Sequence, residues 1–197
     1  MDKSLKEIRK DALQNGLILG GALLVLDILA LFILAHSQSI LMVFISYLFG
    51  YLIIPLTAAI ILIKRLRKKI GGYWNFRQAT SGIFILFLSA YLISSAGSFV
   101  FIKYIRPQIT LEAKNNFVNV LSAFLNRMDT EPEKIDEMAE KIEQQFEATA
   151  NTSVSSVVSN LLSSIIILFI TALVFAAIFK REQLLANHQP ENQNHIS

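Results

Sequence analysis

The pattern of apolar and polar positions divides the chain into four long apolar stretches separated by polar segments. Each stretch is about 24 residues long and almost free of charge, and a helix of that length, at about 1.5 Å per residue, crosses a hydrocarbon core of about 30 Å. Pro55 is expected to kink the second of these helices. The pattern therefore predicts an all-α, polytopic membrane protein with four transmembrane helices. The expected spans are residues 12–35, 40–63, 79–102 and 155–179.

The polar segments between these spans differ in length. The link at residues 36–39 is short and uncharged, which predicts a tight turn between antiparallel helices. Residues 107–154 carry two amphipathic helical patterns, which predict a helical hairpin between the third and fourth spans. Together these parts make one membrane domain over residues 1–181. The segment at residues 182–197 is polar and rich in Asn and Gln, and it is expected to be a disordered cytoplasmic tail.

The basic residues indicate an orientation. The connection at residues 64–77 is strongly basic, and short basic loops stay on the cytoplasmic side of a membrane. Residues 180–181 and the N-terminus are basic too, so both termini are expected inside and the hairpin is expected to be extracytoplasmic. Tyr73, Trp74 and Phe76 lie beside the basic residues and are expected to anchor a helix end at the lipid headgroups. We expect a multi-pass protein of the bacterial inner membrane, in contact with membrane lipid.

The composition is typical of a membrane protein and argues against several classes of function. The apolar fraction is 53% and the mean hydropathy is +0.50, whereas soluble domains are about 45–50% apolar. The net charge of +3 follows from the orientation bias, so it does not indicate a nucleic-acid partner. The chain has no cysteine, which excludes disulfides and thiolate ligands. No recognisable catalytic motif occurs, so we expect no enzyme, no cofactor and no metal site.

One ionisable residue, Asp27, lies deep inside a predicted span. A carboxylate there is costly, and such residues often belong to a proton or ion pathway. Asp27 shares a helix face with Gly16 and Gly20, a small-residue pair that permits close helix approach. Counting along each span from its cytoplasmic end places small polar residues of the other spans at a similar depth. The candidate intramembrane polar layer is Asp27, Tyr47, Ser94, Ser95, Asn160, Ser163 and Ser164.

Two interpretations of this layer remain open. In the first, hydroxyl groups and Asp27 form polar contacts between helices, each worth about 0.6 kcal/mol. In the second, the carboxylate binds a proton or a cation. The sequence shows no Lys, Arg or His inside the spans that could neutralise Asp27.

The predicted hairpin carries more apolar surface than it can bury alone. Each of its two helices has one apolar stripe, and the stripes could contact each other, the membrane surface, the span ends or another chain. The candidate partner-binding residues are Leu121, Phe124, Ile142 and Phe146.

The segment that opens the third span resembles a known family. It reads Gly72-Tyr73-Trp74-Asn75-Phe76-Arg77-Gln78-Ala79-Thr80-Ser81-Gly82 and is similar to the pattern Gly-aromatic-x-x-Phe-x-x-Ala-x-x-Gly of a domain-of-unknown-function family of bacterial inner-membrane proteins, mostly from Bacteroidetes. The acidic hairpin and the basic close of the last span are similar as well. The resemblance implies four membrane helices and supplies no catalytic residues.

These observations lead to two hypotheses. The leading one is a non-enzymatic accessory or interaction protein whose extracytoplasmic hairpin binds a protein partner or a second copy of the chain. The alternative is a small transporter or channel subunit that uses the polar layer around Asp27. Dependence of a flux on Asp27 would distinguish the two.

Overall fold

The computed structural model describes residues 5–150 and 154–181, and the predicted tail at 182–197 lies outside them. Within the described residues every regular element longer than an isolated bridge is a helix. In chain order these are α1 (Leu5–His36), α2 (Ile40–Tyr47), the π-helix η1 (Leu48–Ile53), α3 (Ile54–Lys69), α4 (Phe76–Val100), the π-helix η2 (Phe101–Ile105), α5 (Ile109–Arg127), α6 (Pro132–Ala150) and α7 (Val154–Phe179).

Four helical segments are long and apolar enough to cross a membrane, which agrees with the predicted class. They are Leu5–His36, Ile40–Lys69, Phe76–Ile105 and Ser159–Phe179. The first two are longer than the apolar pattern indicates, because the helices continue through the basic residues that flank the spans. Lys and Arg are good helix formers, and their long side chains can lie along apolar surface while the charges reach water.

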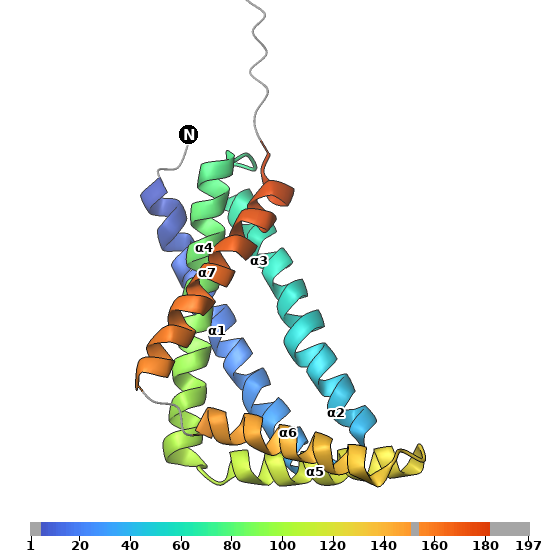
Figure 1. The fold of residues 1–197 in the computed structure, drawn as a ribbon. Coiled ribbons are helices and arrows are strands. Elements are labelled where there is room, and N and C mark those ends of the chain that lie inside the picture. The colour runs from blue at the N-terminus through green and yellow to red at the C-terminus, as the bar shows by residue number, and fades with distance from the viewer. Residues whose placement is uncertain (1–4, 151–153, 182–197) are drawn as a thin grey trace, which may run out of the picture.

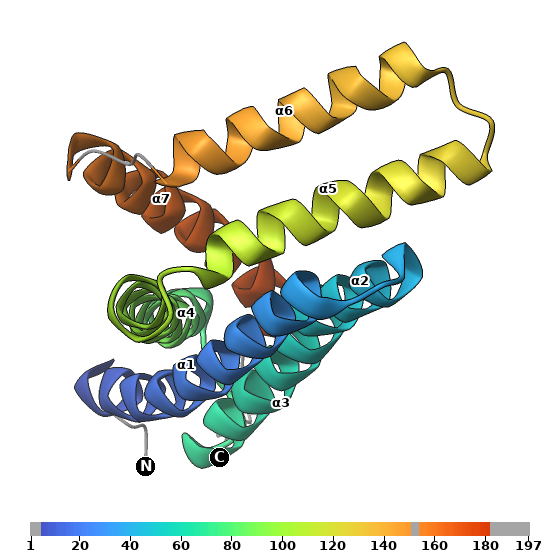
Figure 2. The same cartoon turned by 90° about the horizontal axis from the view of Figure 1, so that it is seen from below.

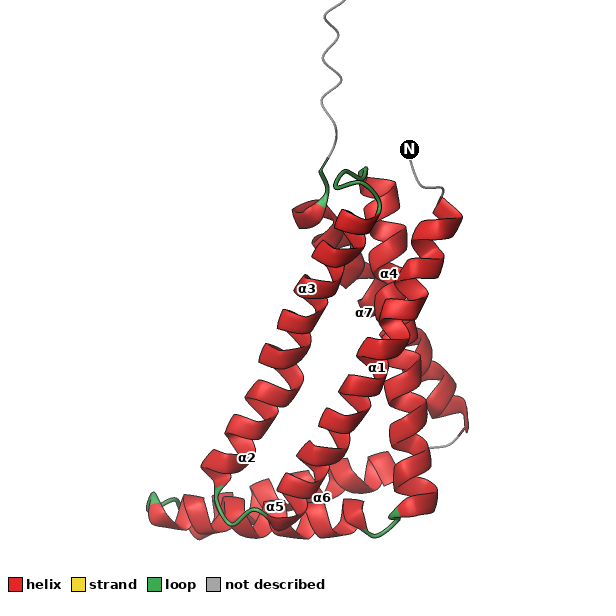
Figure 3. Ribbon diagram, turned by 180° about the vertical axis from the view of Figure 1, so that it is seen from behind, coloured by secondary structure: helices red, strands yellow, loops and turns green. Residues whose placement is uncertain are grey.

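The four spans run alternately up and down, and the hairpin α5–α6 lies crosswise over one end of the bundle (Figures 1 and 3). The connection between α3 and α4, the start of α1 and the end of α7 lie together at the opposite end (Figure 1). We refer to these as the hairpin end and the basic end. The predicted separation of the hairpin from the basic connection is therefore present in the fold.

Helices α1 and α4 form the closest contact of the bundle. A Cβ atom on Gly16 would lie 1.8 Å from the Ser89 Oγ and 2.5 Å from the Leu86 carbonyl oxygen. A Cβ atom on Gly20 would lie 2.7 Å from the Ala90 carbonyl oxygen. The two glycines therefore let the backbones of α1 and α4 touch. The small-residue pair of the sequence serves packing within the chain.

At the basic end, Trp74 joins the last turn of α7 to the start of α4. Trp74 is only 2% exposed, its indole Nε1 donates to the Phe179 carbonyl oxygen at 2.8 Å, and its backbone pairs in both directions with Arg181. Its ring lies against the position where Gly82 has no side chain. The expectation that Trp74 sits at the lipid headgroups is therefore wrong, since the absence of a side chain at Gly82 gives the ring a place inside the protein. Tyr73 and Phe76 remain exposed.

At the hairpin end, α5 packs directly onto the ends of the spans. Ile109 and Ala113 are fully buried against Leu34, Ala35 and Val43. The Asn116 side-chain amide donates to the carbonyl oxygens of Leu34 at 2.9 Å and Ser37 at 2.7 Å. These bonds satisfy carbonyl groups at and just after the C-terminus of α1, which have no partner within the helix. The hairpin is thus an integral cap of the bundle.

The second span is the one least packed against the others. In the most apolar part of each span, 33% of the residues are buried in the third span but only 6% in the second. Its middle is the π-helix η1, in which Ile54 donates its N–H to Phe49, five residues back. Pro55 follows directly, and a wider turn relieves the clash between a proline ring and the preceding turn. The second span consequently diverges from α1 between the two ends (Figures 1 and 3).

Candidate functional site

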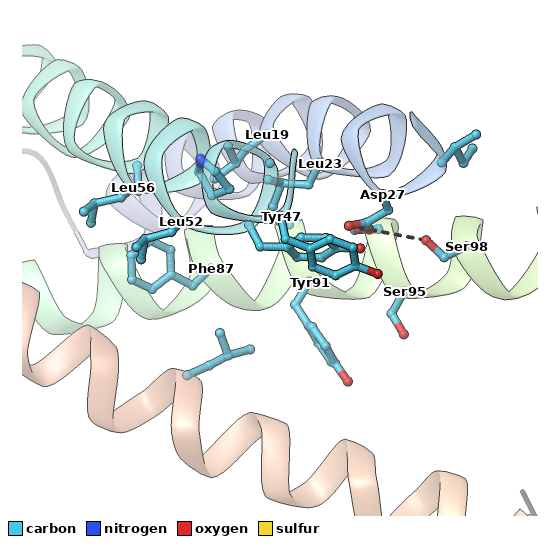
Figure 4. Close-up of a pocket in the computed structure, with 18 of the residues that line it drawn as sticks. Leu19, Leu23, Asp27, Tyr47, Leu52, Leu56, Phe87, Tyr91, Ser95 and Ser98 are labelled. Carbon is cyan, nitrogen blue, oxygen red and sulfur yellow. Dashed lines mark hydrogen bonds between the residues drawn. The ribbon is translucent and has the colours of Figure 1, made fainter. Parts of the chain in front are cut away.

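Asp27 points from α1 toward α4 and is held there by two hydroxyl groups. The Ser94 Oγ donates a short hydrogen bond to Asp27 Oδ2, and the Ser98 Oγ donates to the same oxygen at 3.3 Å. Ser94 and Ser98 lie one turn apart on α4, so both reach one carboxylate oxygen. Ser94 is buried and Asp27 is half-buried. Figure 4 shows the Asp27 carboxylate directed at Ser98.

Two tyrosines of the second span face the same carboxylate. The rings of Tyr47 and Tyr51 stack with centroids 5.0 Å apart, and both side chains interact electrostatically with Asp27. They lie four residues apart at the start of the π-helix η1, on the side turned toward α1 and α4. The second span thus presents two phenol groups to Asp27.

A third tyrosine connects α4 to the last span. Tyr91 extends from α4 toward α7 (Figure 4), and its hydroxyl donates to the Ser164 Oγ at 3.0 Å. Ser164 is therefore engaged with Tyr91 and makes no hydrogen bond to Asp27. The polar groups form two adjoining sets, one centred on Asp27 and one on the Tyr91–Ser164 bond.

These side chains border a cleft of about 770 Å³ between the second span, α1, α4 and α7. Its walls are mostly apolar, and Figure 4 shows Asp27, Ser95 and Ser98 toward one end of the cleft and Leu56 and Phe87 toward the other. No Lys, Arg or His occurs among the described residues that line it. The polar lining residues are Asp27, Tyr47, Tyr51, Tyr91, Ser94, Ser95, Ser98 and Thr171.

The structure brings together part of the predicted layer. Asp27, Tyr47, Ser94 and Ser95 line the cleft, and Ser164 lies next to it through its bond to Tyr91. Two predicted members are elsewhere: Asn160 and Ser163 are exposed and do not line the cleft.

The sequence pattern did not indicate Tyr51 and Tyr91, although each shares a helix face with a predicted member of the layer. Tyr51 follows Tyr47 by four residues, and Tyr91 precedes Ser94 by three. Extending each predicted position by one turn would have found both.

The predicted partner-binding residues of the hairpin have different surroundings. Phe146 packs against the core at the hairpin end, and Leu121 and Ile142 are half-buried. Phe124 is the most exposed of the four, at 41%. Much of the predicted patch is thus covered by the chain itself.

The geometry defines what the cleft can do. It offers one carboxylate, several hydroxyl groups and aromatic faces in an apolar recess, which suits a ligand with a positive or hydrogen-bond-donating group and an apolar body. The described residues contain no group of three or more His, Cys, Asp or Glu side chains that could hold a metal ion.

Fold and site together define a multi-pass α-helical membrane protein with a mostly apolar cleft among its spans, which one carboxylate and several hydroxyl groups also line. Residues 14–181 match the family described as Protein of unknown function (DUF4199), and the chain belongs to this family. No curated protein matches the chain, and no solved structure does.

Proposed function

We propose that this protein is a small, non-enzymatic transport or binding subunit whose cleft holds a small amphiphilic cation against Asp27. The single observation that carries this proposal is a carboxylate, held only by hydroxyl groups, in a cleft of about 770 Å³ among membrane-spanning helices. The transporter hypothesis of the sequence thereby moves ahead of the interaction hypothesis.

The energetics favour a ligand over simple polar contacts between helices. A carboxylate near the middle of a span costs about 2.5–3.5 kcal/mol on insertion scales. A hydrogen bond between membrane helices contributes about 0.6 kcal/mol, so two of them offset about 1.2 kcal/mol. The hydroxyl groups of Ser94 and Ser98 therefore offset about 1.2 kcal/mol, and a hydrogen bond from the Tyr51 phenol would add about 0.6 kcal/mol, which leaves part of the cost. A proton or a bound cation would offset the remainder.

The size of the cleft favours a bound organic cation over a proton alone. A water molecule occupies about 30 Å³, whereas sites for small organic molecules measure about 300–1,000 Å³ and are mostly apolar. The cleft of about 770 Å³ falls in the second range. Leu19, Leu23 and Phe87 supply apolar surface for the body of a ligand, and the tyrosine rings can face a cation.

Calorimetric titration of the purified protein with tetraphenylphosphonium, a lipophilic cation, tests the proposal. We expect saturable binding that is at least about tenfold weaker, or about 1.4 kcal/mol, in the Asp27→Asn variant. This variant keeps the size of the side chain and removes its charge. The Ser163→Ala variant is the matched control, because Ser163 is exposed and does not line the cleft. Equal affinity in the wild-type protein and Asp27→Asn would exclude a role for the carboxylate.

The interaction hypothesis remains a second proposal. It is supported by the exposure of Phe124 on the hairpin, although a lipid surface competes with a protein for the same side chain. If a protein partner or a second copy binds there, Phe124→Asp should remove a species that co-purifies in mild detergent, while the four spans still insert.

We further propose that the basic end faces the cytoplasm of a bacterial cell and that the hairpin lies outside the inner membrane. The basic run from residue 64 to residue 77 supports this orientation. In cells with a permeabilised outer membrane, a single cysteine at Glu140 should react with an impermeant thiol reagent, and one at Lys68 should not. The reverse labelling pattern would overturn the orientation.

A further inference from the structure

Along the first half of α5, one face of the helix points toward the ends of the spans. Ile109 and Ala113 are fully buried against the span ends, and Asn116 donates hydrogen bonds to Leu34 and Ser37 at the end of α1. Positions 109, 113 and 116 fall on one side of a helix. This side of α5 therefore points down the axis of the bundle, toward the interior of the membrane.

The same face continues into the second half of α5, where the spans no longer cover it. Val120, Phe124 and Arg127 follow Asn116 by four, eight and eleven positions, so they share its face. Met128, directly after the helix, lies next to them in the sequence. Phe124 is 41% exposed and Met128 is 63% exposed. In Figure 2 the tip of the hairpin extends beyond the ends of the spans, and Figures 1 and 3 agree.

We propose that this overhanging face, made of Val120, Phe124, Arg127 and Met128, rests on the phospholipid surface. A helix that lies crosswise at the level of the span ends lies in the plane of the membrane interface. Amphipathic helices in that plane insert apolar side chains at the boundary between headgroups and acyl chains. Phe124 and Met128 provide such side chains, and Arg127 can pair with a lipid phosphate.

The geometry favours lipid over a protein as the occupant of this face. The first half of the face touches the span ends directly, so the membrane surface lies about one side chain below the second half. A folded partner would have to enter between the hairpin and the membrane. Asn126, which lies nearly opposite Phe124 around the helix, is exposed and polar, as expected for a side turned to water. The proposal holds for either orientation of the protein and does not depend on the function of the cleft.

Spin labels on single cysteines test the proposal, because the natural chain contains no cysteine. The full protein is placed in nanodiscs of phosphatidylcholine and phosphatidylglycerol, with a label at Phe124→Cys or at Asn126→Cys. These two positions are two residues apart on α5 and point in nearly opposite directions. Collisions of the label with oxygen, which concentrates in lipid, are compared with collisions with a water-soluble nickel chelate.

We expect the ratio of oxygen to nickel collisions to be several-fold higher at position 124 than at position 126. A label at Met128→Cys, which leaves Phe124 in place, should resemble the label at 124. In the double variant Phe124→Glu with Met128→Cys, the ratio at 128 should fall toward the aqueous value. A water-exposed ratio at both 124 and 128 in folded protein would overturn the proposal. So would shielding from both reagents, because that result means the face is covered by protein.

Discussion

The basic end of the bundle and the cleft around Asp27 are built from the same spans, yet they differ in packing. At the basic end, Ile8, Ile63 and Leu66 pack around Trp74, and all four are nearly inaccessible to solvent. Between the two ends, the second span diverges and leaves a cleft of about 770 Å³. The comparison indicates that the tightest packing and the open cleft lie at different levels of one bundle.

The second span shows how this division is achieved. Its last part, α3, joins the core of the basic end through Ile63 and Leu66, and its first part, α2, contributes Val43 to the core under the hairpin. Between them lies the π-helix η1, which lines the cleft with Gly50 and Tyr51, and Pro55 in the first turn of α3 lines it as well. The span is thus fixed at both ends and open in the middle. A break in the regular helix at a functional site is a recurring feature of π-helical segments.

The largest effect is expected from removing the central side chain of the basic end. Trp74→Ala deletes a ring that is 2% exposed and a hydrogen bond to Phe179, and it should lower the free energy of unfolding by about 3–5 kcal/mol. Unfolding of the purified protein in mixed micelles, followed by circular dichroism, measures the change. Tyr73→Ala is the control, because Tyr73 is 49% exposed and should change stability by less than about 0.5 kcal/mol. Similar losses in both variants would mean that the buried ring is not what holds this end together.

A smaller change in the free energy of unfolding is expected from substituting two glycines of α1, with opposite signs at the two positions. Gly16→Ala places a Cβ atom 2.5 Å from the backbone oxygen of Leu86, so α1 and α4 must separate, at a cost of about 1–3 kcal/mol. Gly21→Ala meets nothing within 4 Å and should stabilise the helix by up to about 1 kcal/mol. The same unfolding experiment measures both variants. Stabilisation by both substitutions would contradict the close contact between α1 and α4.

The sequence predicts the parts of this molecule that depend on local physics. Long apolar stretches must be helical in a membrane, because every backbone group needs a partner there. Counting residues also places Asp27, Tyr47 and Ser94 at one depth, and the three line one cleft, because the rise of a helix is constant. Local patterns are therefore enough for the spans and for the centre of the candidate site.

The features that depend on how helices cross were not predictable in this way. Asn160 and Ser163 have the expected depth, but α7 crosses α4 so that both are exposed. The π-helix η1 was not predicted, because the apolar pattern does not reveal its wider turn. Trp74 lies beside basic residues in the sequence, as an interfacial anchor does, but the space beside Gly82 accommodates its ring inside the core. The outcomes in α7 and at Trp74 are each set by a contact between segments far apart in the chain.

The smallest effect on stability is expected at the centre of the cleft. Asp27→Leu removes the hydrogen bonds from Ser94 and Ser98, a loss of about 1.2 kcal/mol at about 0.6 kcal/mol per bond. It also removes the cost of the carboxylate, so it should not lower the free energy of unfolding by more than about 1 kcal/mol. Asp27→Asn keeps an acceptor oxygen and should unfold like the wild-type protein. Both values come from the same unfolding experiment and are compared with Trp74→Ala.

This last measurement decides what kind of residue Asp27 is. If Asp27 serves ligand binding, replacing it weakens the binding of a lipophilic cation while stability hardly changes, whereas Trp74→Ala lowers stability strongly. A loss on Asp27→Leu as large as the loss on Trp74→Ala would reverse the comparison. The carboxylate would then be a structural contact between α1 and α4, and it would no longer support the proposal that the cleft binds a ligand.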